Sequence, residues 1–395
     1  MERNGLSISG GGWEVGVRDR SAVHPGRTCS LEATCDTPST VHAAWEMSMV
    51  DSVRVGIEAL EARVQGILEI CGVAPMPAGA VARVIVAGER DGCASHGLHR
   101  LEQCLQVLKA GQVEPEAEPR LAAGEGPILR VDAGGGFAPA AWELARPALI
   151  ARTRELGLAA LAITDCLHFA ALWPEVEDLA RAGLASISMC PSYATVAPFG
   201  GTEPLLGTNP FAFGWPRPDA DPYVFDFATS VAARGEVELH RKAGTELPEG
   251  WAVDRAGAPT RDPQAALDGA LLTFGAHKGT AISAMIELLA GAMLGDRMSV
   301  EARDFAGGAA LPPRHGALIL AFDPGTFAAG SGRDPGQEGE RLIEALGGQT
   351  GRLPSQRRYA ARTISKADGI GLSADQMATL DRLSEGGLDA VRAPG

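Results

Sequence analysis

The chain of 395 residues has no run of 18 or more apolar residues, so no transmembrane helix is expected. Its first residues, MERNGLSISGGGWEVG, lack the apolar centre of a secretory signal. Cysteine is scarce and no Cys-x-x-Cys pair occurs, which argues against a zinc site and against a disulfide framework. We therefore expect a cytoplasmic protein with reduced thiols. The cysteines lie at positions 29, 35, 71, 93, 104, 166 and 190.

Positive charge is also in short supply. The 35 Lys and Arg residues are outnumbered by 49 Asp and Glu residues, which gives a formal net charge of −14. This balance argues against nucleic acid as a partner and against binding to an anionic membrane. It still permits an anionic substrate, because a local pocket of Arg and Lys outweighs the mean field at short range. Apolar residues make up 45% of the chain, which supports a substantial folded core.

Three common fingerprints are missing: the dinucleotide-binding GxGxxG, the P-loop GxxxxGK[ST] and the nucleophile elbow GxSxG. The stretch VDAGGGFAPAAWELA, residues 131–145, follows a strand-like segment and precedes a helix. It lacks the GxGxxG spacing, however, so no Rossmann fingerprint is predicted there.

Apolar periodicity indicates an α/β protein preceded by an irregular leader. Residues 1–46 are rich in Gly, Ser, Thr and Arg, and we expect a disordered extension or an upstream mis-start. Gly- and Pro-rich residues 192–222 predict a long functional loop. The predicted helices cover 57–71, 78–87, 98–110, 145–157, 176–183 and a buried 281–294, with further helices from 334 on. The predicted strands cover 158–164, 184–190, 223–230 and 316–324.

The triplet Ser95-His96-Gly97 lies directly before a predicted helix. In one interpretation Ser95 is only an N-cap and His96 is an exposed first-turn residue. In the other, Ser95 hydrogen-bonds the imidazole, and His96 gives a proton to a substrate atom that gains electron density. Arg100 follows four residues after His96, where a guanidinium can grip a carboxylate with two parallel hydrogen bonds or pair with Glu102.

Two basic segments are candidate anion sites. His277 and Lys278 precede a helix, whose free N–H groups would add to a phosphate cradle, although a basic loop flank is equally consistent with the pattern. Arg352, Arg357 and Arg358 are close enough to hold a ribose 2′-phosphate, or form a solvated basic face.

Polar residues also cluster near predicted strand ends. His168, Phe169 and Trp173 follow one strand, where ligands of α/β proteins often bind, although core packing also explains the aromatics. Asp226, Arg234 and Glu236 follow another strand, and a carboxylate that reached His96 would orient its ring. Thr208 and Asn209 precede a proline, where their side chains either bind a ligand or close a turn.

Seven segments occur in a fixed order: SHGLHR, HFAALWPE, EPLLGTNPFAF, FDFATSVAARGE, PEGWAVDRAGAPTRDP, FGAHKG and GRLPSQRR. Together they resemble the malate/L-lactate dehydrogenase-like oxidoreductases over about residues 53–380. Within that family, HFAALWPE and ARGE are most similar to the cyclic imino acid reductases.

The resemblance implies an α/β fold in which a mixed-sheet domain binds NAD(P) without a Rossmann fold, beside a helical domain built from N- and C-terminal segments. It implies an N-terminal helical part at 47–127, a cofactor-binding domain at 128–300 and a returning C-terminal segment at 301–395. It also implies a homodimer.

The same resemblance implies NADPH-dependent reduction of Δ1-piperideine-2-carboxylate to L-pipecolate and of Δ1-pyrroline-2-carboxylate to L-proline. One alternative is an NAD(P)-dependent dehydrogenase of malate, lactate or a related 2-hydroxy acid. Another is a non-catalytic scaffold, which the intact Ser95, His96 and Arg100 argue against. The arginine cluster favours NADPH, while NADH stays open because arginines also neutralise a pyrophosphate.

By resemblance, Ser95 would be a relay partner, His96 the proton donor and Glu236 the acidic relay member. Many close reductases carry Asp at the position of Glu236, so the longer side chain alters the expected geometry. The implied substrate residues are Arg100, Thr208, Arg234 and Gly235, and no metal is implied. The implied cofactor residues are His168, Phe169, Ala170, Ala171, Leu172, Asp226, Phe227, Ala228, His277, Lys278, Thr350, Gly351, Arg352, Leu353, Pro354, Ser355 and Gln356.

Overall fold

A computed structural model describes residues 53–308 and 311–393, so the predicted leader at 1–46 lies outside the described residues. The strands are β1 (Val53–Val55), β2 (Arg120–Leu121), β3 (Ile128–Asp132), β4 (Leu158–Leu167), β5 (Ala185–Met189), β6 (Val196–Ala197), β7 (Phe211–Trp215), β8 (Tyr223–Phe227), β9 (Ala252–Val253), β10 (Pro259–Thr260), β11 (Ala270–Leu272), β12 (Arg314–Phe322) and β13 (Ile370–Leu372). The α-helices are α2 (Ile57–Ile70), α3 (Pro75–Arg90), α4 (His99–Lys109), α5 (Ala138–Leu156), α6 (Trp173–Arg181), α7 (Arg234–Ala243), α8 (Pro263–Asp268), α9 (His277–Ile286), α10 (Ser299–Phe305), α11 (Pro324–Ala328), α12 (Pro335–Thr350), α13 (Gln356–Asp368) and α14 (Ala374–Gly386). Short 3-10 or π turns are η1 (Ala94–His96), η2 (Glu287–Gly291), η3 (Ala292–Leu294) and η4 (Gly387–Ala390).

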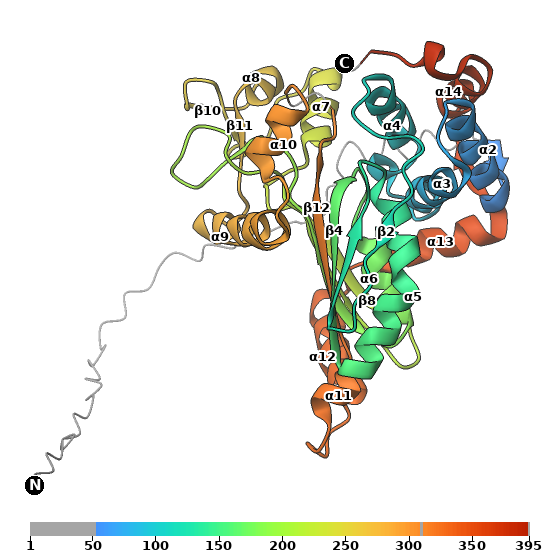
Figure 1. Ribbon diagram of the computed structural model, residues 1–395. Coiled ribbons are helices and arrows are strands. Elements are labelled where there is room, and N and C mark those ends of the chain that lie inside the picture. The colour runs from blue at the N-terminus through green and yellow to red at the C-terminus, as the bar shows by residue number, and fades with distance from the viewer. Residues whose placement is uncertain (1–52, 309–310, 394–395) are drawn as a thin grey trace, which may run out of the picture. The chain divides into compact units, whose positions relative to one another are not determined.

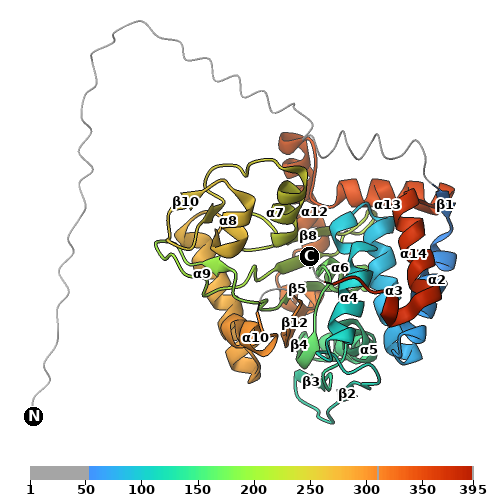
Figure 2. The ribbon, with the colours of Figure 1, turned by 90° about the horizontal axis from the view of Figure 1, so that it is seen from above.

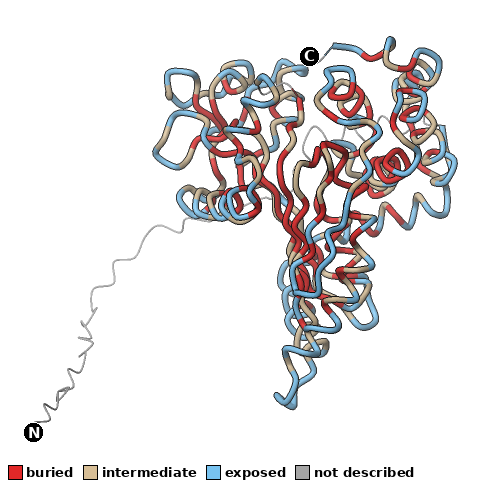
Figure 3. Tube along the Cα trace, viewed as in Figure 1, coloured by how far each residue is buried: buried red, intermediate tan, exposed pale blue. Residues whose placement is uncertain are grey.

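A seven-stranded mixed sheet forms the centre, in the order β2-β3-β4-β12-β5-β7-β8. Strands β3 and β4 are parallel and joined by α5, whereas the other neighbours in the sheet are antiparallel. In Figure 1, β12 and β4 run side by side through the centre of the ribbon. Figure 3 shows that much of these two strands is buried.

The two faces of this sheet are covered by different elements. On one face, α5 and α6 pack on alternate residues of β12, among them Ala317, Ile319 and Ala321. On the other face, α9 and η2 pack through Ile286 and Ala290 against Leu318 and its neighbours. Each fully buried aliphatic side chain contributes about 1.5–3 kcal/mol, so these two layers account for much of the stability.

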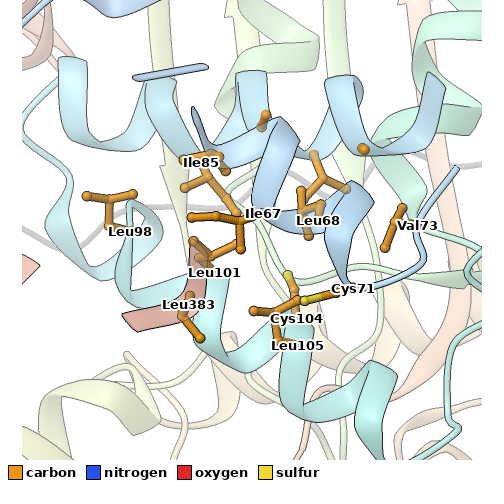
Figure 4. Close-up of a cluster of buried hydrophobic side chains, with 14 of the residues drawn as sticks. Ile67, Leu68, Cys71, Val73, Ile85, Leu98, Leu101, Cys104, Leu105 and Leu383 are labelled. Carbon is orange, nitrogen blue, oxygen red and sulfur yellow. The ribbon is translucent and has the colours of Figure 1, made fainter. Parts of the chain in front are cut away.

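The first helices and the C-terminal segment share a second core. Strand β1 pairs antiparallel with β13, and α14 packs against α2 (Figure 2). Figure 4 shows Ile67, Leu68, Ile85, Leu101 and Leu383 meeting in this core. The predicted fold class is therefore confirmed, because a helical unit from both chain ends accompanies a mixed sheet. The exact boundaries at 127/128 and 300/301 stay predictions.

A smaller sheet, in the order β10-β9-β11-β6, lies beside α7 and α8. Its core contains Val196, Leu206, Val237, Leu247 and Leu271. It anchors the segment between β8 and α9, which carries several of the predicted site residues.

Most predicted elements are confirmed, but the helix predicted at 145–157 begins earlier, at Ala138, and three further corrections apply. Residues 192–222 were predicted to be one long loop, but the apolar alternation of FAFGW forms strand β7 inside it, where Pro210 and Pro216 mask the signal. The helix predicted at 281–294 starts earlier, passes into η2 and η3, and exposes Met285, Leu288 and Met293 rather than being buried all round. The helix predicted at 78–87 extends over the whole of α3, because Pro75 supplies a ready-made first turn.

The glycine triplet at 134–136 forms the turn between β3 and α5. The guanidinium of Arg314 occupies the space that a Cβ at Gly135 would need, and the Ala117 methyl does the same at Gly136. The turn is therefore filled by protein side chains rather than open to a phosphate.

Among the described residues no single helix is long and apolar enough to cross a membrane, although the pair His277–Leu294 and Ser299–Phe305, bent by 65°, passes the length and composition test together.

Candidate active site

The catalytic candidate His96 lies in the 3-10 turn η1, between α3 and α4. Its Nδ1 is 3.0 Å from the hydroxyl oxygen of Ser95, as the sequence predicts for a hydroxyl that holds the imidazole. The turn fits tightly on α3, because a Cβ at Gly88 would overlap the carbonyl of His96. Gly88 therefore allows the close helix approach that fixes the backbone of His96.

The alternative role for Ser95, as the N-cap of the following helix, is wrong. The N-cap of α4 is Leu98, and its N–H donates to the Glu89 carboxylate at 2.7 Å. Glu89 in turn accepts a bond from Gln376 of α14, at 3.2 Å. A buried carboxylate from α3 thus caps α4 across space, which leaves the Ser95 hydroxyl for His96.

Arg100 reaches back to the turn rather than lying one regular helical turn beyond His96. Its Nε donates to the carbonyl of Ser95 at 2.8 Å, and its Nη1 donates to Gln103 at 2.7 Å. No carboxylate pairs with it among the described residues, and Glu102 pairs with Arg382 instead. Burial lowers the pKa of Arg100, while the nearby Tyr193 and Cys104 oppose that shift. A half-buried cation without an acidic partner is suited to a substrate carboxylate.

His96 is neutral at neutral pH. The pKa of His96 is lowered to about 3. Burial is the largest cause, and the positive charge of Arg100 and the neighbouring His99 lower it further. The imidazole is therefore an acceptor or a tautomer-dependent donor until a ligand changes its surroundings.

His168 follows β4 and belongs to the same site. Burial, together with His315, His96 and Arg100, lowers the pKa of His168 to about 3, which means that it is neutral as well. Its ring stacks on that of His315, with 6.4 Å between centroids. Its Nε2 is 4.0 Å from Oε1 of Glu175 on α6.

Asp226 joins two of the predicted cofactor segments. It is the penultimate residue of β8, and its Oδ2 accepts from the N–H groups of Leu172 at 2.7 Å and Trp173 at 2.9 Å. Burial raises the pKa of Asp226 to about 6, against the lowering effect of these bonds and of Arg358. The predicted segment Thr350–Gln356 lies against the same strand, because the Ser355 hydroxyl donates to the carbonyl of Val224.

Within the segment His168–Leu172, side chains differ in their access to a ligand. Phe169 and Leu172 are buried in the two hydrophobic cores, Phe169 against Phe137 at 6.0 Å between ring centroids. Ala170 and Ala171 are half-buried. A cofactor would therefore meet the backbone, the two small alanines and His168 here.

Arg358 does not belong to a phosphate site, and that part of the predicted arginine cluster is wrong. Its side chain is buried over the ring of Trp173, 4.1 Å from the centroid, and it lies 3.4 Å from Glu177 and 3.7 Å from Asp91. Arg352 and Arg357 remain exposed, and neither has an acidic partner among the described residues. The sequence could not separate these roles, because the three arginines look alike in GRLPSQRR.

A third group of predicted site residues consists of Thr208, Phe227 and the start of α9. The carbonyl of Thr208 accepts from the N–H of Thr229 at 2.8 Å, and the carbonyl of Thr229 accepts from Phe274 at 3.0 Å. Phe227 is 43% exposed, and its ring meets that of Phe274 edge-on. His277 and Lys278 are exposed at the first turn of α9.

Backbone strain, seen as positive φ angles, occurs at or beside several predicted site residues. Outside glycine, the described residues with positive φ are Asp165, Asn209, Ala276 and Ser355. Ala276 directly precedes His277, Asn209 follows Thr208, and Ser355 is itself a predicted cofactor residue. Such strain concentrates at functional sites, which supports these three segments.

Asn209 closes a buried polar cluster rather than facing a ligand. It is fully buried, donates to Glu287 at 2.7 Å and accepts from the N–H of Ser192 at 3.0 Å. Its side chain therefore links distant segments of the chain, rather than closing the local turn that the sequence suggested.

The helix α7 carries Arg234, Gly235 and Glu236 without joining them to His96. Glu236 is exposed, and its carboxylate forms no hydrogen bond or ion pair with any described residue. The charge of Lys242, on α7, acts on His99 at the start of α4, whose pKa is lowered first by burial, then by Arg100 and then by Lys242. The relay role of Glu236 stays a prediction.

Over residues 55–381 the chain matches the malate/L-lactate dehydrogenase family. The chain belongs to this family. The Δ1-pyrroline-2-carboxylate reductase of Agrobacterium fabrum is 60% identical over 344 residues, which cover 87% of this chain and 100% of that protein. The Δ1-pyrroline-2-carboxylate/Δ1-piperideine-2-carboxylate reductase of Pseudomonas aeruginosa is 52% identical over 291 residues, 74% of this chain and 87% of that protein.

The fold agrees with solved structures as well. The Δ1-piperideine-2-carboxylate reductase of Pseudomonas syringae superposes with a TM-score of 0.80 at 40% identity, covering 84% of this chain and 100% of that one. As a member of the malate/L-lactate dehydrogenase family, the chain is an oxidoreductase that uses a nicotinamide cofactor.

The residues present fit such a cofactor. Lys278, Arg352 and Arg357 are cations without acidic partners among the described residues, as a phosphate-bearing ligand requires. Leu353, Pro354 and Gln356 line a cavity of about 220 Å³. A larger cavity, of about 500 Å³ around Pro216 and Pro218, contains none of the predicted site residues.

Sequence reasoning missed four residues of this site. Gly88 and Glu89 shape the catalytic turn, Tyr193 lies near Arg100, and Glu175 lies beside His168. Only Glu175 carried a usable signal, since it is an acidic residue inside the motif HFAALWPE.

Proposed function

We propose that this oxidoreductase uses NADPH to reduce cyclic 2-imino acids, converting Δ1-pyrroline-2-carboxylate to L-proline and Δ1-piperideine-2-carboxylate to L-pipecolate. The observation that carries the proposal is Arg100, a half-buried cation without a carboxylate partner in the described chain, bonded to the turn that holds His96. The substrates named for the relatives from A. fabrum and P. aeruginosa support this choice of substrate class.

In the proposed reaction, Arg100 binds the substrate carboxylate and thereby positions the adjacent C2 atom. The nicotinamide cofactor supplies a hydride to C2. His96 holds or delivers the proton at the ring nitrogen that gains electron density, while Ser95 keeps its imidazole oriented. A bound carboxylate neutralises Arg100, which removes one cause of the low pKa of His96 and makes protonation of the imidazole easier.

The choice of NADPH is supported by Arg352 and Arg357, which are exposed, free of acidic partners among the described residues, and close to the predicted cofactor loop. Replacing both by Ser should raise the KM for NADPH at least about tenfold, because charged hydrogen bonds to a 2′-phosphate are lost. The KM for NADH should stay unchanged. Equal effects on both cofactors would instead assign these arginines to the pyrophosphate.

The test of the reaction is NADPH oxidation, followed by absorbance, with four substrates in parallel: Δ1-pyrroline-2-carboxylate, Δ1-piperideine-2-carboxylate, pyruvate and oxaloacetate. Faster turnover of the cyclic imines, with L-proline and L-pipecolate as products, is the expected result. Turnover of only the open 2-oxo acids would overturn the proposal and identify a 2-hydroxy acid dehydrogenase.

We also propose a homodimer. On the sheet face that α9 covers only in part, six residues form a continuous cross-strand row of incompletely buried apolar side chains. The row runs through Ile128, Ala160, Leu320, Ile187, Phe213 and Phe225, each paired with the next. A second copy covering this row would remove it from water, which is the usual reason for such a patch.

The dimer is tested with a charged substitution at its exposed edge. Ile128 and Leu158 are 60% and 41% exposed, so Ile128→Lys with Leu158→Lys should lower the sedimentation mass without unfolding the chain. Ile70→Lys on α2, where Ile70 is 63% exposed, is the matched control and should leave the mass unchanged.

We also propose a cytoplasmic location, which is supported by the free thiols of Cys71, Cys93, Cys104, Cys166 and Cys190.

A further inference from the structure

Glu175 is a buried acid that neither the fold nor the proposed reaction explains. It lies in the first turn of α6 and is 6% exposed. Its Oε2 has no hydrogen-bond partner among the described residues, and its Oε1 is 4.0 Å from Nε2 of His168. An unpartnered buried carboxyl oxygen is costly, so this group is expected to have a purpose.

The charges around Glu175 favour its neutral form. Burial raises the pKa of Glu175 well above its usual value, its own backbone N–H opposes this shift, and Asp226 and Asp178 add to it. The nearest basic group, His168, is itself neutral. Glu175 is therefore a carboxylic acid, with an O–H to donate.

His168 needs such a donor to fix its tautomer. Neutral imidazole carries one N–H, and the nitrogen that accepts a hydrogen bond leaves the N–H on the other. His168 forms no hydrogen bond with any described residue, so its two tautomers are not distinguished by other contacts. The neighbouring His315 illustrates the effect, because its Nδ1 donates to the carbonyl of Gly316 at 2.9 Å.

We propose that Glu175 is a positioning residue for His168: its carboxylic acid donates to Nε2 and so keeps Nδ1 as an N–H donor toward an acceptor oxygen of the cofactor. The inference rests on the proposed cofactor role of residues 168–172. Active-site hydrogen bonds are often long before ligands bind, so the 4.0 Å separation shortens by a side-chain adjustment when the site fills.

Because the contact shortens when the site fills, it is tested by the tautomer of His168 in the complex with NADPH, without substrate. The protein is labelled with ¹⁵N-histidine, and the ring resonances of His168 are assigned by comparison with His168→Gln. Long-range ¹H–¹⁵N spectra should show the Nδ1–H tautomer in the wild type and in Glu175→Gln, whose amide also donates. In Glu175→Met, which has similar volume and no donor, the resonances should shift toward the Nε2–H tautomer. An unchanged tautomer in Glu175→Met overturns the proposal.

Kinetics provides the second readout. Glu175→Gln should keep kcat/KM within about twofold, whereas Glu175→Met should raise the KM for NADPH about tenfold, as for the loss of one hydrogen bond. Equal losses in both variants would mean that an ionisable carboxyl is needed, which contradicts the proposal. If the tautomer shifts as expected while the wild type does not reduce imines, the proposed function fails and this inference stands.

Discussion

Two glutamates on helix α6, only two residues apart, are in opposite electrostatic states. Glu175 and Glu177 are 6% and 4% exposed, so both have lost nearly all contact with water. Burial raises the pKa of Glu175 well above its usual value. Burial also acts to raise the pKa of Glu177, but hydrogen bonds and charge from Arg362, with Arg181 and Arg358, outweigh it and lower that pKa.

The partners of Glu177 come from distant parts of the chain. Arg362 of α13 contacts both Glu177 and Asp91, the latter through Nε at 2.9 Å, and Arg358 lies beside both carboxylates. The buried part of this ion network, formed by Asp91, Glu177, Arg358 and Arg362, joins α3, α6 and α13, and Arg90 and Arg181 also pair with its two carboxylates. Because Asp91 lies just before the catalytic turn, the network also anchors the base of the site.

The comparison teaches that partners, rather than burial, decide the charge of a buried acid. The paired Glu177 helps to hold three helices together, whereas the unpaired Glu175 lies beside His168. Substitutions in the ion network are expected to change stability, whereas substitutions at the candidate active site are expected to change activity.

The largest expected effect is on catalysis. His96→Ala should lower kcat by about 10²- to 10⁴-fold, because the proton donor or acceptor at the reacting nitrogen is lost. The dissociation constant for NADPH and the free energy of unfolding should change little. Steady-state kinetics, cofactor titration by fluorescence and urea unfolding measure these three quantities, and an unchanged kcat would remove His96 from the catalytic role.

The next largest expected effect is on the free energy of unfolding. Glu177→Gln should lower the free energy of unfolding by about 3–5 kcal/mol, because it leaves buried arginines with too little negative charge. Glu175→Gln is the matched control on the same helix, and should cost less than about 1 kcal/mol, since that acid is already neutral. Urea unfolding of both variants measures the difference, and equal losses would contradict the comparison.

Arg100 has no structural carboxylate to lose, so its removal should affect binding. Arg100→Ala should raise the KM for the imino acid about 10- to 100-fold, the range expected for a charged hydrogen-bonded contact, with a smaller change in kcat. The KM for NADPH serves as the internal control. An unaltered substrate KM would rule out the carboxylate clamp.

The smallest predicted effect concerns acid stability. The pKa of His168 is lowered to about 3 in the fold, against about 6.5 in an unfolded chain. As the pH falls below that unfolded value, the unfolded chain takes up a proton that the fold does not, so the free energy of unfolding falls. The raised pKa values of Asp226 and Glu175 work in the opposite direction.

His168→Gln isolates the contribution of His168 to the pH dependence of the free energy of unfolding. Between pH 7 and pH 5.5 its free energy of unfolding should fall by about 1 kcal/mol less than that of the wild type. Urea unfolding at both pH values measures the slope. Identical slopes in the two proteins would show that His168 is not held neutral in the fold.

Local sequence predicted much of this molecule. The alternation and helical spacing of apolar residues located most strands and helices, because side-chain periodicity follows directly from backbone geometry. The triplet Ser95-His96-Gly97 and Arg100 were found as a unit, since they are close in the chain. Strand β7 was missed because its flanking prolines and glycines resemble a loop.

The chain's own order of residues therefore determined its family, its mixed α/β architecture and the hydroxyl-imidazole pair of Ser95 and His96. Only the tertiary structure decided that Arg358 is buried in an ion network, that Glu89 rather than Ser95 caps α4, and that Glu175 is a neutral acid. These outcomes depend on groups that pack together from far apart, as with Asp91 and Arg362, which are separated by 271 residues. Charge state and capping are set by what lies within a few ångströms, and no local pattern specifies those neighbours.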